Sequence, residues 1–164
     1  MATPIDKGDT INFEDAIKKK SLPAVKYYYK LNPSIIHQRI EYVLTPLFLA
    51  SRIGCLDIVM FLISKGVDID QPSETMSPLQ EAACSGHLST IQYLLNRKAN
   101  INYQDNEGCT ALHYAIYFNH FHAVDLLIKM NANISLVNSE GKTPLQYAID
   151  NDRRFIAKYL SSLI

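Results

Sequence analysis

The chain has 164 residues, of which 48% are hydrophobic, and its 16 basic and 16 acidic side chains give a net charge of zero at pH 7. This balance excludes the large positive charge with which general nucleic-acid-binding proteins neutralise phosphates, so we expect no nucleic-acid partner. No run approaches the roughly 18 to 20 apolar residues of a membrane-spanning helix, which predicts that the chain does not insert into a membrane.

Two features bear on location. The amino terminus lacks the short apolar core of a signal peptide. The cysteines Cys55, Cys84 and Cys109 are odd in number and lack the paired spacing of a zinc site or a disulfide framework. A reducing compartment fits best, and we expect a cytoplasmic protein, with the nucleus or a host cytosol as alternatives.

The first predicted element is a helix pair within about residues 11–43. Phe13, Ala16 and Leu22 lie 34 residues before Leu47, Ala50 and Leu56, which indicates a diverged copy of the unit that follows. Residues 1–40 hold seven basic and four acidic side chains, and we expect a solvated helix face there, with an anionic contact as the alternative. The segment 32–43 contains a proline, which favours a loop between the first and second units.

Four further units follow, each opened by the same short motif. The copies are Thr45-Pro46-Leu47, Ser77-Pro78-Leu79, Thr110-Ala111-Leu112-His113 and Thr143-Pro144-Leu145. Their leucines are 32, 33 and 33 residues apart, and an alanine follows each leucine three residues later. The hydroxyl side chain is a good helix N-cap, and proline suits the first helical turn. A fixed period near 33 residues predicts a stack of repeated helical units.

Each first helix is expected to end at a residue that tolerates a left-handed backbone. Gly54 and Gly86 suit this position, Asn119 can replace them, and Asp152 fits less well. A second apolar helix follows in every unit, and glycine-containing tips at 106–108 and 139–141 lead to the next one. The tip at 72–75 lacks a glycine, so an irregular turn is expected there. The last helix carries Arg153 and neighbouring basic residues toward solvent.

These motifs resemble the ankyrin repeat, and the resemblance covers residues from about 11 to 164. It implies an all-α solenoid of about five helix-turn-helix units with β-hairpin tips, in a single domain of residues 1–164. The expected repeats are about 11–43, 44–76, 77–109, 110–142 and 143–164. Asn102 is similar to an asparagine that is hydroxylated in some ankyrin repeats.

Catalysis needs a nucleophile, a base or a metal cluster in one place, and the sequence offers only a group of histidines. His113 ends the repeated motif, where the resemblance implies a structural hydrogen bond between repeats. His120 occupies a turn position, for which a structural role is expected, and His122 is expected on an exposed helix face. We therefore predict no enzyme activity, no cofactor and no metal.

The resemblance implies a concave face that is lined by the ends of the first helices and by the tips. Tyr117 and Phe118 stand out, because exposed aromatic pairs tend to mark interaction sites. The alternative is that both rings pack across the stack and stiffen it. The candidate partner-binding residues are Arg52, Ile53, Met76, Cys84, Ser85, Asn106, Glu107, Cys109, Tyr117, Phe118, Asp150 and Asn151.

We therefore predict a non-catalytic module, monomeric on its own, that binds a partner protein as an adaptor or as a stoichiometric inhibitor. Two alternatives remain open. The chain could be the targeting module of a larger enzyme, or a host-directed effector of an intracellular microbe. The sequence does not identify the partner.

Overall fold

The computed structural model describes residues 12–40, 44–74 and 76–164. The basic and acidic residues of the amino-terminal 1–11, the segment 41–43 and Thr75 lie outside this description. Within the described ranges there are ten α-helices and one short 3₁₀ helix. They are α1 (Phe13–Lys18), α2 (Leu22–Leu31), the 3₁₀ helix η1 (Pro33–His37), α3 (Pro46–Arg52), α4 (Leu56–Ser64), α5 (Pro78–Cys84), α6 (Leu88–Asn96), α7 (Ala111–Tyr117), α8 (Phe121–Lys129), α9 (Pro144–Asp150) and α10 (Arg154–Ser161).

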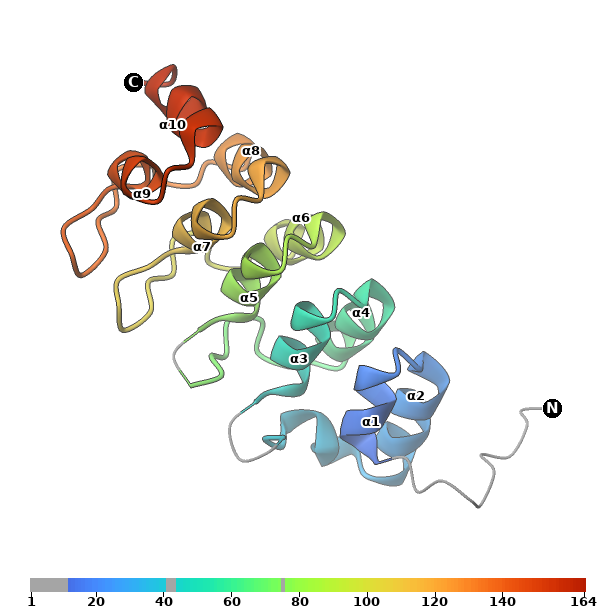
Figure 1. Ribbon diagram of the computed structural model, residues 1–164. Coiled ribbons are helices and arrows are strands. Elements are labelled where there is room, and N and C mark those ends of the chain that lie inside the picture. Colours follow the sequence, from blue (N-terminus) through green and yellow to red (C-terminus); the bar gives the residue numbers. More distant parts are fainter. Residues whose placement is uncertain (1–11, 41–43, 75) are drawn as a thin grey trace.

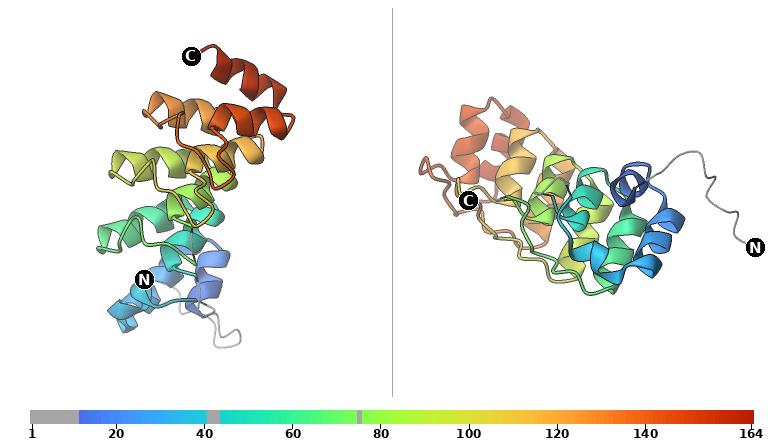
Figure 2. Two further views of the ribbon diagram at one scale, coloured as in Figure 1. Left: turned by 90° about the vertical axis from the view of Figure 1, so that its left-hand side faces the viewer. Right: turned by 90° about the horizontal axis from the view of Figure 1, so that it is seen from below.

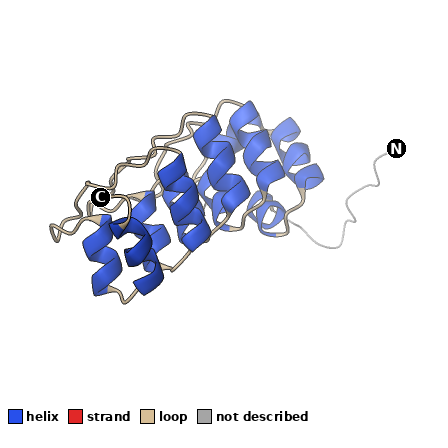
Figure 3. Ribbon diagram, turned by 90° about the horizontal axis from the view of Figure 1, so that it is seen from above, coloured by secondary structure: helices blue, strands red, loops and turns tan. Residues whose placement is uncertain are grey.

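The helices stack in two parallel rows (Figure 1). The first helices α1, α3, α5, α7 and α9 form one row, and the second helices α2, α4, α6, α8 and α10 form the other. Figure 2 shows the units following one another from the amino-terminal to the carboxy-terminal end, and in Figure 3 the loops run along one edge of the helices. The long loops therefore belong to the side of the first helices.

The core lies between the two rows and between successive units. The alanines of the repeated motif, Ala50, Ala82, Ala115 and Ala148, are all fully buried where first helices approach one another. The second helices contribute stripes of isoleucine, valine and leucine, among them the fully buried Ile58, Ile91 and Leu127. This confirms the stacked all-α architecture predicted from the period.

The predicted helix starts are confirmed in every copy of the motif. Thr45 Oγ1 accepts a hydrogen bond from the Phe48 backbone N–H at 3.2 Å, and Ser77 and Thr143 cap their helices in the same way. Thr110 Oγ1 accepts a hydrogen bond from the His113 N–H, and His113 Nδ1 accepts one from the Thr110 N–H. These two bonds form a capping box at the start of α7.

The turns between paired helices are regular throughout the four motif-bearing units. Gly54 (φ 67°), Gly86 (φ 71°), Asn119 (φ 60°) and Asp152 (φ 55°) all adopt the left-handed region. Asp152 was the weakest candidate from sequence, yet aspartate is among the few residues that enter this region at modest cost. The last turn is therefore built like the others.

The tips are turns, and within the described residues none of them extends into a strand. The pair Ser73 and Met76 exchanges two backbone hydrogen bonds of 2.9 and 3.1 Å, with Glu74 in the left-handed region (φ 53°). The 105–109 and 138–142 tips are each held by Oδ1 of one side chain, Asp105 or Asn138, which accepts from two backbone N–H groups. Expected β-hairpin ladders are thus not observed as strands.

The connection between the first two units contains η1 in place of the predicted loop, followed by an isolated bridge between Ile40 and Leu44. No helix in the described ranges is both long and apolar enough to span a bilayer. The repeat boundaries given above remain a proposal.

Candidate protein-interaction surface

The structure places the predicted binding residues at the two ends of the first helices. Arg52, Cys84, Tyr117 and Asp150 are the last residues of α3, α5, α7 and α9, and each is followed by its predicted neighbour. Met76, Asn106, Glu107 and Cys109 lie in the segments that lead into α5 and α7. A seven-residue helix is about 10 Å long, so one continuous surface can include both groups. We call this surface the inner face.

The inner face carries an aromatic cluster formed by Tyr117, Phe118 and Tyr147. Tyr117 is 45% exposed and Phe118 is 47% exposed. Their ring centroids are 5.1 Å apart in an edge-to-face arrangement, and the Tyr117 ring lies 6.2 Å from that of Tyr147 in α9. Phe118 also stacks on His120 at 6.4 Å. The rings therefore contact one another across two units, while about half of the surface of Tyr117 and of Phe118 stays exposed to solvent.

Two ion pairs involve other residues of the inner face. Arg52 Nε donates to Oε1 of the buried Glu81 at 2.9 Å, and its guanidinium lies over the Phe48 ring at 4.9 Å. In the other pair, Lys142 Nζ lies 2.9 Å from Asp150 Oδ2, and this hydrogen bond holds the pKa of the Asp150 carboxyl below its usual range. The carboxylates of Glu81 and Asp150 are therefore each paired with a cation.

The other predicted residues at the ends of the first helices are hydrogen-bonded or partly buried. Ile53 packs against the core, and Ser85 is partly buried. Asn151 Nδ2 donates to the Tyr147 carbonyl at 2.8 Å, which closes the end of α9. Burial, with the Glu81 carboxylate as a smaller cause, raises the pKa of the Cys84 thiol to about 12, so this thiol is neutral and unreactive near pH 7.

The tip group divides between exposed and buried side chains. Asn106 and Glu107 are exposed, and Met76 is partly buried. Cys109 is buried, with its N–H donating to Asp105 Oδ1 at 3.0 Å and its carbonyl accepting from Gln80 Nε2 at 2.7 Å. Cys109 therefore ties the tip to α5 and offers little surface to a partner.

Asn102, the residue compared with hydroxylated asparagines, also links two units. Its Oδ1 accepts a hydrogen bond from the Asn133 backbone N–H at 2.9 Å. Its side chain is thus engaged in the stack.

Sequence reasoning missed a position three residues before the end of each first helix, occupied by Glu81, Tyr114 and Tyr147 in successive units. Glu81 pairs with Arg52, Tyr147 contacts Tyr117, and the Tyr114 hydroxyl donates to Asp105 Oδ2 at 2.6 Å. A spacing of three places these side chains on the same helix face as the predicted residues. That spacing is a signal that could have identified them.

The histidines have structural roles, as predicted for His113 and His120. His113 is buried, burial lowers its pKa, and its Nε2 donates to the Lys142 carbonyl just before α9 at 3.3 Å. His120 Nε2 donates to the Cys84 carbonyl at 3.0 Å, and His87 Nε2 donates to the Arg52 carbonyl at 2.9 Å. The His87 and His120 bonds form a ladder that ties the turns at Gly86 and Asn119 to the ends of the preceding first helices.

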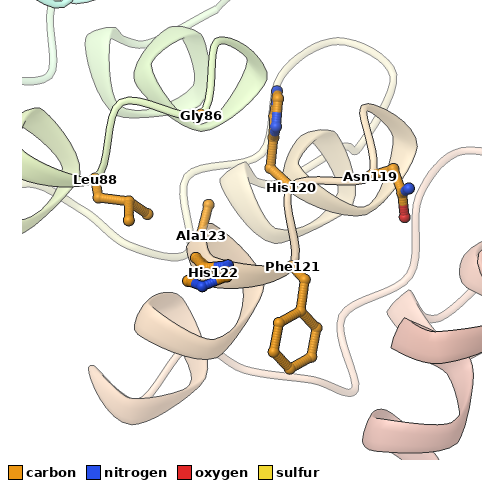
Figure 4. Close-up of a pocket in the computed structure, with 7 residues that line it drawn as sticks. All are labelled: Gly86, Leu88, Asn119, His120, Phe121, His122 and Ala123. Carbon is orange, nitrogen blue, oxygen red and sulfur yellow. The ribbon is translucent and has the colours of Figure 1, made fainter.

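A cleft of about 360 Å³ lies beside this ladder, between the α7–α8 turn and the start of α6 (Figure 4). The His120 ring points toward Gly86, whereas Phe121 points away from it. His122 is exposed. Across the described ranges no three His, Cys, Asp or Glu side chains are grouped so that they could hold a metal ion.

Comparison with known proteins agrees with this architecture. The family model for ankyrin repeats in many copies matches residues 54–95 and 79–128. An ankyrin repeat protein of Fowlpox virus (strain NVSL) is 34% identical over 106 residues, which cover 63% of this chain and 31% of the viral protein. Residues 54–128 of the chain are ankyrin repeats. Ankyrin repeats indicate a protein-interaction module, and the family is in general non-catalytic.

Other relatives of this ankyrin-repeat protein are proteins of very different kinds. The B-cell lymphoma 3 protein homolog of Mus musculus is 39% identical over 74 residues, covering 44% of this chain and 16% of the mouse protein. A phosphocholine transferase of Legionella pneumophila is 34% identical over 71 residues, covering 42% of this chain and 8% of the transferase. The chain spans less than a third of the length of each of these relatives, so the likeness concerns the repeats.

Proposed function

We propose that this ankyrin-repeat protein binds a partner protein through its inner face, as an adaptor or as a stoichiometric inhibitor. The observation that carries the proposal is the aromatic cluster, in which Tyr117 and Phe118 are about half exposed although the repeat does not require aromatic residues there. Aromatic side chains with little freedom to move are the residues that most often dominate binding energy.

The surroundings of the cluster also suit a protein partner. The rings are apolar, and the same face also carries the ion pairs Arg52–Glu81 and Lys142–Asp150. Protein interfaces typically combine aromatic side chains with polar groups in this way. A standard interface buries about 800 Å² on each partner, an area that three or four neighbouring units can supply.

Affinity capture tests the proposal. The wild-type chain and the double variant Tyr117→Ala/Phe118→Ala are used as baits in parallel, and the captured proteins are identified by mass spectrometry. Tyr27→Ala is the matched control, because Tyr27 is 48% exposed and lies on α2, away from the inner face. A partner of the inner face is retained by wild type and by the control and is lost with the double variant. Equal capture by all three baits contradicts the proposal.

A second candidate function is supported by the relatives. Because the Legionella transferase and the viral protein are both longer than the matched region, the repeats could act as the recognition segment of an effector or of a larger enzyme. In that case the inner face would select the target while chemistry resides elsewhere. Transfer of the tagged protein into host cells from its native source tests the effector reading, and retention within the source cell contradicts it.

A further inference from the structure

The opposite side of the molecule has a groove that the inner face does not explain. It lies between α2 and α4, which are neighbours in the row of second helices in Figure 1. We call this row the outer row. Leu22, Met60 and Phe61 provide its apolar lining, and its volume is about 340 Å³. Met60 is 42% exposed, so the groove presents apolar surface to solvent.

Two lysine side chains converge on one ring of this groove. Lys26 Nζ lies 5.9 Å from the Phe61 ring centroid, and Lys65 Nζ lies 5.5 Å from the same centroid. Lys65 is also 5.4 Å from the Tyr29 ring, which packs edge-to-face against Phe61 at 5.5 Å. The aromatic faces attract both ammonium groups and hold them above the apolar lining.

Neither of these lysines forms an ion pair with a carboxylate in the described part of the chain. Elsewhere in that part, Lys18, Lys129 and Lys142 each pair with an acid two to four residues away. Lys26, which lines the groove, and Lys65, which follows the lining residue Ser64, are therefore two cations close to one aromatic ring, and neither has a carboxylate ion-pair partner among the described residues. This arrangement is complementary to an anion attached to an apolar group.

Asp57 also lines the groove, and its carboxylate restricts the choice of ligand. A nucleic acid or an anionic membrane would bring uniform negative charge against this carboxylate, and like charges at close range are unfavourable. A peptide can instead place its acidic residues near the lysines and keep them away from Asp57.

We propose that the α2–α4 groove docks an acidic peptide segment of a partner protein, with an apolar side chain between Leu22 and Met60 and carboxylates on Lys26 and Lys65. This surface is distinct from the inner face and would allow the chain to contact two proteins at once. Its failure would leave the inner-face proposal intact.

The test is a selection of random peptides displayed on phage against the full chain. Enriched peptides are synthesised, and their affinities are measured by fluorescence anisotropy for the wild type, for Lys26→Glu/Lys65→Glu and for the milder Lys26→Gln/Lys65→Gln. The matched control is Lys129→Glu/Lys158→Glu, which changes the net charge equally on α8 and α10 of the same outer row. Circular dichroism verifies that each variant is folded.

The proposal predicts enriched peptides that combine an apolar anchor with nearby Asp or Glu. Reversing the charge of Lys26 and Lys65 should weaken their binding by about tenfold or more, with a smaller loss for the Gln variant and less than about twofold for the control. The Tyr117→Ala/Phe118→Ala variant should bind these peptides as the wild type does.

Three results would overturn the proposal. The first is enrichment of peptides without acidic residues, and the second is binding that the two lysines do not affect. The third is binding of phosphatidylserine-containing vesicles or of a DNA duplex that requires Lys26 and Lys65, while no enriched peptide requires them. That outcome would assign the groove to a lipid surface or a nucleic acid.

Discussion

Replacement of Gly86 by alanine probes the contact that joins successive turns. Gly86 has a φ of 71°, and a β-carbon built there would lie 2.8 Å from Nδ1 of the His120 ring. The same ring donates from Nε2 to the Cys84 carbonyl at 3.0 Å. Alanine at this position therefore has to adopt a left-handed backbone and also has to displace the histidine that links the two units.

The two effects can be separated with a second glycine. Gly141 has nearly the same φ, 73°, but a β-carbon there would meet no described atom within 4 Å. Gly141→Ala should therefore cost only the left-handed strain, about 1–2 kcal/mol. Gly86→Ala should cost this amount plus the loss of the His120 hydrogen bond, which is worth about 0.5–1.5 kcal/mol.

Urea unfolding followed by circular dichroism measures both costs, and a double-mutant cycle tests their origin. In a His120→Ala background, Gly86→Ala should become about as mild as Gly141→Ala, because the ring that it displaces is absent. Equal costs for the two glycine variants in the wild-type background, or a Gly86 cost that His120→Ala leaves unchanged, would refute this reasoning.

Further predictions concern burial and thiol chemistry. Ser51 Oγ is buried and has no hydrogen-bond partner among the described residues, and the next unit has Ala83 in its place. Ser51→Ala should therefore raise the free energy of unfolding by about 1 kcal/mol, and a decrease would contradict this. Leu112→Ala should cost about 2–5 kcal/mol in urea, since the side chain is buried, and a loss below about 0.5 kcal/mol would mean that the register is wrong. Because the pKa of the Cys84 thiol is raised to about 12, little of it is thiolate at pH 8.5. Iodoacetamide should therefore label Cys84 at least about tenfold more slowly in the folded chain than in urea. Equal rates would show that the fold does not protect this thiol.

Local chemistry explains why much of the fold could be predicted. The caps at Thr45 and Ser77 and the left-handed turn at Gly54 depend on residues close in sequence, and the repeat multiplies each signal. Asp152 illustrates the limit of this local rule. Aspartate favours the left-handed backbone less than glycine does, yet Asp152 adopts it at the last turn, where the last two helices pack together. The tips did not become strands, since each is closed by one or two backbone hydrogen bonds and no partner strand extends them.

The candidate site was less predictable, because its contacts depend on how neighbouring units are placed. The contact of Tyr117 with Tyr147 and the pairing of Arg52 with Glu81 join residues about 30 positions apart. Repetition predicts that such positions are near each other, but it does not predict which side chains meet. Cys109 shows the reverse case, since this tip residue was expected at the surface but is buried, with its backbone carbonyl accepting from Gln80.

The central claim is that Tyr117 and Phe118 are anchors for a partner and not part of the core. The most direct measurement is calorimetric titration of a captured partner with the wild type and with Tyr117→Ala/Phe118→Ala, together with urea unfolding of both chains. We predict a loss of binding free energy of at least about 2 kcal/mol, roughly thirtyfold in Kd. The free energy of unfolding should change by less than about 1 kcal/mol. A collapse in stability with unchanged affinity per folded molecule would contradict the claim and assign both rings to the core.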